Sequence, residues 1–160
     1  MRIAPLMFVV TLTLGGADSP SQAQNAKEAF KLSKDEQAVL DLVNAERAKE
    51  KLSALKANEF LTKAARDHSA NMAKQGKLDH TLDDKGPDER VKALGYQFSR
   101  VGENIAWGQS TPAAVMESWL SSTDHKANIL GEYTEFGIGY ATDADGRRYW
   151  TQVFATPASR

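Results

Sequence analysis

Residues 136–154, FGIGYATDADGRRYWTQVF, decide the fold class of this chain. Two runs rich in aromatic and β-branched residues, Phe136–Thr142 and Arg148–Phe154, are separated by a polar segment containing Asp145-Gly146. Asp-Gly between two such runs is typical of a tight turn between antiparallel strands. The stretch Gly137–Thr142 lacks the third glycine of a dinucleotide-binding fingerprint. The C-terminal part is therefore predicted to be a β-hairpin.

Helical patterns dominate the residues before this hairpin. Ser33 and Glu36 have the spacing of a capping box at a helix start, and Asn58 can cap a second helix that Gly76 closes. Pro directly after Thr111 is typical of a first helical position. The expected helices cover 33 to about 50, 58–76, 88–94, a helix from 111, and a short turn at 125–130.

The stretch Phe98–Trp107 contains Gly and Asn residues that disfavour a long regular element. It is predicted to be a short strand with a structured loop at Gly102-Glu103-Asn104. Helices first and a hairpin last indicate an α+β fold with helices stacked on an antiparallel sheet.

Composition bounds the function. The 160 residues are 41% hydrophobic and 26% charged, as in one ordinary globular domain, and the formal net charge of -1 gives no motive for binding nucleic acid. Because the chain has no cysteine, disulfides, a thiol nucleophile and Cys-ligated zinc are excluded. Any catalysis must use hydroxyls, carboxylates or the three histidines.

The N-terminal segment has the pattern of a targeting signal. Arg2 precedes a mostly apolar stretch of about a dozen residues, too short to span a bilayer, and small polar residues lead to Ala23. We expect a signal peptide at 1–23, a polar lead-in at 24–35 and a single domain at 36–157. The expected location is secreted or periplasmic, with no transmembrane segment after cleavage.

Sequence motifs for common hydrolases are absent. There is no Gly-x-Ser-x-Gly elbow, no P-loop and no His-Glu-x-x-His helix. An acidic loop can be interpreted either as solvated surface or as a divalent cation site. Its members are Asp79, Asp83, Asp84, Asp88 and Glu89.

Five segments closely resemble, in family order, the signatures of the CAP superfamily, also called the SCP domain. They are Val43–Arg47, Leu78–His80, Gly102–Ile105, Trp119–Leu130 and Trp150–Phe154. The superfamily includes cysteine-rich secretory proteins, antigen-five and pathogenesis-related proteins, and short bacterial exported proteins. The resemblance implies a three-layer α-β-α sandwich with an open cleft. It also implies that Leu78–His80 is the entry to a strand, with His80 as its last residue.

The same resemblance implies a site. His80 matches the first cleft histidine and Glu103 matches the family carboxylate. Ser122 stands where eukaryotic members have a second glutamate, and Tyr149 where they have a second histidine. His125 resembles a histidine of the bacterial branch. The expected cleft residues are His80, Glu103 and His125, with Tyr149 and Gln152 as polar neighbours.

Two uses of this cluster remain open. Two neutral imidazoles and a carboxylate are a plausible set for a divalent metal such as zinc, so His80, Glu103 and His125 are candidate metal ligands. Alternatively, Glu103 fixes the histidine tautomers or accepts backbone N–H bonds, and the group only lines a polar cleft.

Other residues are expected to support the fold. His68 lies on the apolar stripe of the second helix and is predicted to be a core histidine or a support of the cleft. Asn44 and Arg47 are expected to tie the first helix to neighbouring segments. The expected structural residues are Asn44, Arg47, Asn104, Trp119 and Asn128.

Two functions follow from these observations. The first is an exported, non-catalytic binding module, expected to be a monomer, that takes a divalent metal, lipid or envelope ligand. The alternative is a metal-dependent hydrolase with Glu103 as general base. The first is favoured because the sequence has no dedicated nucleophile or oxyanion hole.

Overall fold

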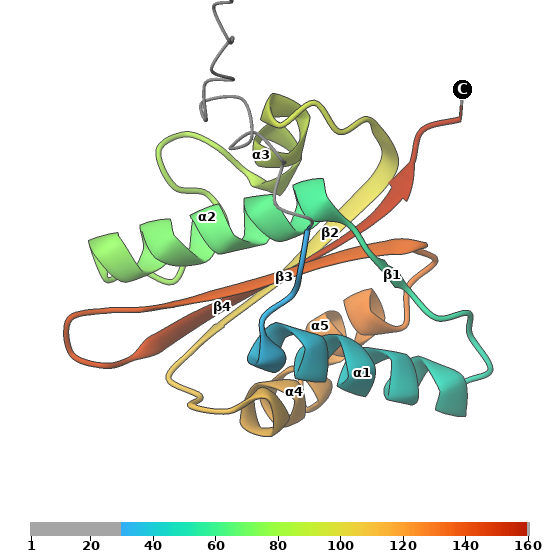
Figure 1. Cartoon of the computed structure of the whole chain (residues 1–160), viewed down its shortest axis with the longest axis horizontal. Helices are drawn as coiled ribbons and strands as arrows, with labels where there is room; N and C mark the ends of the chain where they lie inside the picture. Colours follow the sequence, from blue (N-terminus) through green and yellow to red (C-terminus); the bar gives the residue numbers. More distant parts are fainter. Residues whose placement is uncertain (1–29, 160) are drawn as a thin grey trace, which may run out of the picture.

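A computed structural model describes residues 30–159, which form five helices and four strands (Figure 1). In chain order these elements are α1 (Lys34–Lys49), β1 (Lys56–Ala57), α2 (Glu59–Gln75), α3 (Pro87–Ala93), β2 (Phe98–Trp107), α4 (Pro112–Leu120), α5 (Thr123–Ile129), β3 (Glu135–Thr142) and β4 (Arg148–Pro157).

The strands form one sheet in the order β1-β3-β4-β2. The predicted hairpin is confirmed, since β3 and β4 pair antiparallel with Tyr140 opposite Trp150. The expectation of an antiparallel sheet needs one correction, because β1 pairs parallel with β3. This two-residue strand forms where the connection between α1 and α2 runs along β3, and Asn58 donates its backbone N–H to Phe136 at 2.9 Å.

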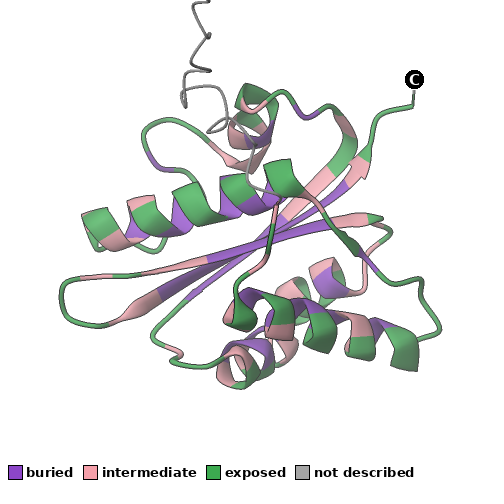
Figure 2. Cartoon of the chain, viewed as in Figure 1, coloured by how far each residue is buried: buried purple, intermediate pink, exposed green. Residues whose placement is uncertain are grey.

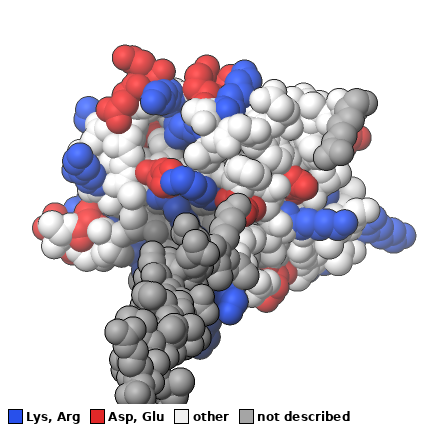
Figure 3. Space-filling view, turned by 45° about the horizontal axis from the view of Figure 1, so that its top comes forward, with Lys and Arg blue, Asp and Glu red and all other residues white. Residues whose placement is uncertain are grey.

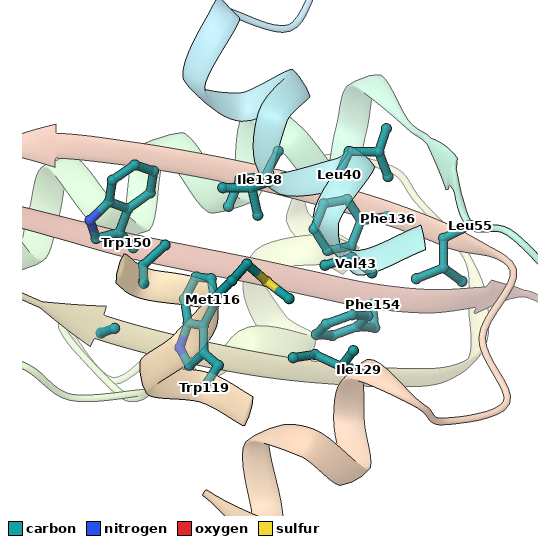
Figure 4. Close-up of a cluster of buried hydrophobic side chains, with 13 residues drawn as sticks. Leu40, Val43, Leu55, Met116, Trp119, Ile129, Phe136, Ile138, Trp150 and Phe154 are labelled. Carbon is teal, nitrogen blue, oxygen red and sulfur yellow. The ribbon is translucent and has the colours of Figure 1, made fainter. Parts of the chain in front are cut away.

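Helices cover both faces of the sheet, so the three-layer α-β-α architecture is confirmed. Figure 1 shows α2 and α3 on one face and α1, α4 and α5 on the other. Each helix turns its buried side toward the sheet (Figure 2). The larger apolar cluster, drawn in Figure 4, joins α1, α4 and α5 to one face through Val43, Trp119 and Ile129, in one cluster with Phe154 of β4. On the other face, Leu61 and Ala65 of α2 pack with Val153.

The helix termini follow the local signals in the sequence. The Ser33 side chain accepts from the Glu36 backbone, and the Glu36 carboxylate accepts from the Ser33 backbone at 2.7 Å. Asn58 caps α2, and Gly76 ends it with a left-handed φ of 63°. Each cap satisfies backbone groups that the helix leaves without partners, so the predicted boundaries lie within a few residues of the observed ones.

The interface between α2 and β3 depends on two glycines. A Cβ atom added to Gly137 would lie under 3.0 Å from backbone atoms of Leu61 and Thr62, and one added to Gly139 would lie equally close to the backbone of Arg66. The helix backbone therefore rests directly on the strand backbone. No other residue type fits at these positions without moving α2.

The interpretation of 98–107 as a short strand with a loop is wrong. All of Phe98–Trp107 is one strand, and it pairs with β4 through Gly102, Glu103 and Asn104, with a register irregularity only between Phe98 and Arg100. Pairing with β4 satisfies the backbone and overrides the weak strand propensity of Gly and Asn. The segment Gly102-Glu103-Asn104, which was expected to be a loop, is thus part of a regular strand.

The expected signal peptide at 1–23 and the first part of the lead-in lie outside the described residues. Among residues 30–159, no helix has the length and apolar character needed to cross a membrane. Figure 3 shows side chains of both charge signs interspersed over one face of the molecule.

Candidate functional site

The site is organised by the alternation of side chains along β2. Successive residues of a strand point to opposite faces, so Glu103 lies on the α2 face and Asn104 on the α5 face. Glu103 is close to His68 of α2, whereas Asn104 donates to the backbone carbonyl of His125 at 3.0 Å. Because β2 is an edge strand of the sheet, groups from the two faces can meet beyond it.

The Glu103 carboxylate is buried and engaged at both oxygens. Its side chain is 1% exposed, with His80 Nδ1 at 2.8 Å from Oε1 and Arg90 donating to Oε2 at 2.6 Å. An ionised carboxylate only accepts hydrogen bonds, so the proton of the neutral His80 ring belongs on Nδ1. The Nε2 lone pair of His80 is then free to contact a ligand, and the side chain of His80 is 49% exposed.

Arg90 of α3 was not expected from the sequence. Besides its bond to Glu103, it donates to the backbone carbonyls of His80 and Lys85 at 2.8 and 2.6 Å. The interpretation of Leu78–His80 as a strand entry is wrong, because these residues lie in the connection between α2 and α3. No local pattern marks Arg90, since only the packing of α3 near β2 brings it to the carboxylate.

His80 and His125 contact neighbouring residues of β2 from opposite faces of the sheet: the His80 ring bonds to Glu103, and the backbone carbonyl of His125 accepts from Asn104. His125 belongs to α5 and is partly buried. Burial lowers the pKa of His125 below its usual value, a protonated His80 would lower it further, and Asp124 opposes this. His125 therefore stays neutral below the pH at which an ordinary histidine is protonated.

His68 lies behind the carboxylate, buried as its apolar stripe predicts. Its Nε2 is 3.8 Å from Glu103 Oε1, and within the described part of the chain neither ring nitrogen has a hydrogen-bond partner of normal geometry, although the Asp79 backbone lies nearby. Burial lowers the pKa of His68, Glu103 opposes this and Arg90 reinforces it. A neutral imidazole is therefore favoured beside the buried carboxylate.

The two expected polar neighbours both lie in the interior. Tyr149 is 1% exposed and belongs to a buried cluster that includes Met72 and Ile105. Gln152 is fully buried and accepts from Asn104 at 3.0 Å on the α5 face. The structure therefore does not bring either side chain to the surface beside His80; Gln152 supports the site through Asn104.

The expected structural residues fasten the edge of β2. Asn128 donates to the backbone carbonyl of Glu103 at 3.1 Å and to the side chain of Asn104 at 2.8 Å. Trp119 donates to the backbone carbonyl of Ile105 at 3.1 Å. These side chains occupy outward carbonyls that an edge strand otherwise leaves unpaired. The position of Glu103 is fixed from the backbone as well as from its carboxylate.

The two structural residues of α1 act far from Glu103. Asn44 accepts from the Leu55 backbone at 2.8 Å and donates to its carbonyl at 3.1 Å. Arg47 donates to main-chain carbonyls on both sides of the α5 C-terminus. These bonds connect α1 to the segment before β1 and to the residues around the end of α5.

The donor set does not fit a metal ion ligated by Glu103. Both oxygens are engaged, and the Arg90 guanidinium already balances the charge of the carboxylate. In residues 30–159, no three or more His, Asp or Glu side chains are grouped so that they could hold a metal ion, and this includes the acidic loop. Among the described histidines, His68 is fully buried behind Glu103, so the nitrogens open to a cation from solvent are those of His80 and His125.

Comparison with known proteins assigns the chain to one family. The profile described as CAP, the cysteine-rich secretory protein family, matches residues 40–154. The chain is 39% identical over 121 residues to YkwD of Bacillus subtilis, covering 74% of this chain and 46% of that protein. It is 31% identical to the B. subtilis protein YlbC, described as a membrane protein, covering 74% and 34%. The chain thus spans less than half the length of these two relatives.

Solved structures share the fold. An outer surface protein of Borrelia burgdorferi superposes with a TM-score of 0.75 at 20% identity, covering 81% of this chain and 97% of that one. An extracellular protein containing an SCP domain, from Bacillus anthracis, has a TM-score of 0.69 at 26% identity, covering 80% and 45%.

Proposed function

Because this chain belongs to the cysteine-rich secretory protein (CAP) family, we propose that it is an exported, non-catalytic binding module. Its recognition groups are the imidazoles of His80 and His125, and Glu103 holds His80 from beneath. Export is supported by the signal-like residues 1–23 and by similarity to a protein described as extracellular. The proposed location is the periplasm or the medium.

The burial of Glu103 is the observation that carries this proposal. A general base must reach the water that it activates, directly or through one other water. The Glu103 side chain is 1% exposed and both oxygens are engaged, so it is suited to orienting His80 and poorly suited to deprotonating a water. Binding is therefore better supported than the alternative of metal-dependent hydrolysis with Glu103 as base.

The ligand chemistry follows from the exposed nitrogen of His80. A neutral Nε2 accepts a hydrogen bond from a polar group of a lipid or envelope polymer, and it can also ligate a divalent metal. A bound divalent ion would be held by His80 and His125 and would supply a positive contact for an anionic group. Zinc chloride is the most direct probe of this pair, because imidazole is a common zinc ligand.

We expect zinc binding, measured by isothermal titration, to depend on the pair. His80→Ala should weaken the affinity at least about tenfold, and Glu103→Gln about 10- to 100-fold because the carboxylate supports the ligating ring. The affinity should also fall as the pH drops, since imidazolium cannot ligate a metal. Because burial lowers the pKa of His125, that ring should stay available below the pH at which an ordinary histidine is protonated.

Asp84→Asn is the matched control for this titration. It removes a carboxylate of the acidic loop and should leave zinc affinity unchanged. If the double variant His80→Ala, His125→Ala kept the parent affinity while Asp84→Asn lost it, the histidine pair would be the wrong site.

A further inference from the structure

Three acceptors from two separate segments converge on the guanidinium of Arg90. They are the backbone carbonyls of His80 and Lys85 in the connection after α2, and the carboxylate of Glu103 in β2. The Arg90 side chain is only 12% exposed. A guanidinium presents five N–H donors in a rigid fork, so one arginine can hold these acceptors in a fixed arrangement.

Two of these bonds lead to the same residue. Arg90 holds the main chain of His80 directly, and it holds the ring through Glu103, whose other oxygen lies 2.8 Å from Nδ1. We propose that Arg90 is the positioning residue of the site. Its bonds to the His80 carbonyl and to Glu103 together fix the orientation and tautomer of the His80 ring. The inference rests on the proposed function only in taking His80 as the binding group.

The connection between α2 and α3, which carries His80, has little regular structure of its own that could fix the position of this residue. Within residues 76–86 there is a single isolated bridge, between Leu82 and Lys85. Asp83 and Asp84 have φ values of 53° and 56°, a region that residues other than glycine rarely adopt. The connection is tied to α2 at Asp83, but at His80 itself the described structure shows the bonds from Arg90 to its carbonyl and from its ring to Glu103, so these bonds define where the ring lies.

Two substitutions separate the charge of Arg90 from its fork geometry. Arg90→Lys keeps a positive charge for Glu103 but cannot hold three acceptors in one plane. Arg90→Gln removes the charge and leaves the buried carboxylate without its cation. Arg100→Gln is the matched control, because Arg100 lies on β2, is 53% exposed and pairs only with the exposed Glu132 in the described structure.

The test is the long-range ¹H–¹⁵N spectrum of the histidine rings in the ¹⁵N-labelled full chain without zinc. The parent and Arg100→Gln should each show one His80 pattern, with Nδ1 protonated and Nε2 bare. Arg90→Lys and Arg90→Gln should show a mixture of tautomers. In Arg90→Lys, zinc affinity should also fall about tenfold or more while the thermal transition stays cooperative.

Each result bears on one claim. An unchanged His80 pattern in folded Arg90→Lys would overturn the positioning role, whatever the zinc titration shows. If the parent bound no zinc while the Arg90 variants still mixed the tautomers, the proposed ligand chemistry would fail and the role of Arg90 would stand. If Arg90→Gln does not fold, Arg90→Lys alone decides, because it retains the charge that the buried carboxylate needs.

Discussion

Replacing Gly137 with alanine is expected to lower the free energy of unfolding by about 3 kcal/mol or more. The added Cβ would lie under 3.0 Å from backbone atoms of Leu61 and Thr62, and backbone cannot rotate away as a flexible side chain can. To admit the methyl group, α2 must move off β3 and open the apolar layer between them. Most single substitutions cost much less, so this loss is a large part of the stability of an ordinary domain.

Urea unfolding followed by circular dichroism measures this loss. Gly76→Ala is the matched control, because it makes the same chemical change at a position with nothing within 4 Å of the new Cβ. It should cost only about 1–2 kcal/mol, for the left-handed backbone at φ 63°. Equal unfolding midpoints for Gly137→Ala and the parent would show that α2 does not rest on the β3 backbone.

Removing the guanidinium of Arg47 is expected to have a similar effect. Arg47 is 2% exposed and donates to the backbone carbonyls of Ser53, Ile129 and Gly131 at 2.8 to 2.9 Å, with Tyr133 at 3.4 Å. Burial lowers the pKa of Arg47. Arg47→Met fills much of the volume but removes the donor to these carbonyls. The Ile129 carbonyl is buried, whereas Gly131 keeps a bond from the Tyr133 backbone and Ser53 is exposed. A buried group without a partner costs about 1–3 kcal/mol, and the bonds of the others add less.

The net loss should be about 3 kcal/mol, because removing a buried charge offsets part of the cost. Thermal and urea unfolding of Arg47→Met measure it. Arg100→Met, at an exposed arginine, should change stability by less than about 0.5 kcal/mol. If both variants unfolded at the same urea concentration, Arg47 would not be the tie between α1 and the residues after α5.

The sequence predicted best those elements that local groups define. The caps at Ser33 and Asn58, the C-terminal Gly76 and the Asp145-Gly146 turn each act within a few residues, and all are observed. Phe98–Trp107 was predicted poorly, because its extension as one strand depends on β4, about fifty residues away. The short strand β1 has no sequence pattern, since it exists only through its pairing with β3.

In the site, too, residues within sequence motifs were predicted better than residues whose position depends on packing between distant elements. The pairing of His80 with Glu103 was expected from the motifs, and it is observed at 2.8 Å. Arg90 was missed because its role depends on how α3 packs, and nothing in its neighbouring residues reports this. Tyr149 was expected beside the site because it occupies a family position, yet alternation along β4 turns it into the α2-side core.

The most direct measurement follows the Glu103 carboxyl carbon and the imidazole nitrogens by NMR as zinc chloride is added. The account predicts that Nε2 of His80 and the His125 ring shift strongly with zinc, that the Glu103 carboxyl keeps its hydrogen bond to His80 Nδ1 and shifts only slightly through it, and that the His68 ring stays unchanged. A shift of the Glu103 carboxyl that saturates with zinc, in step with loss of its bond to His80, would make Glu103 a direct ligand and contradict its role as a buried support.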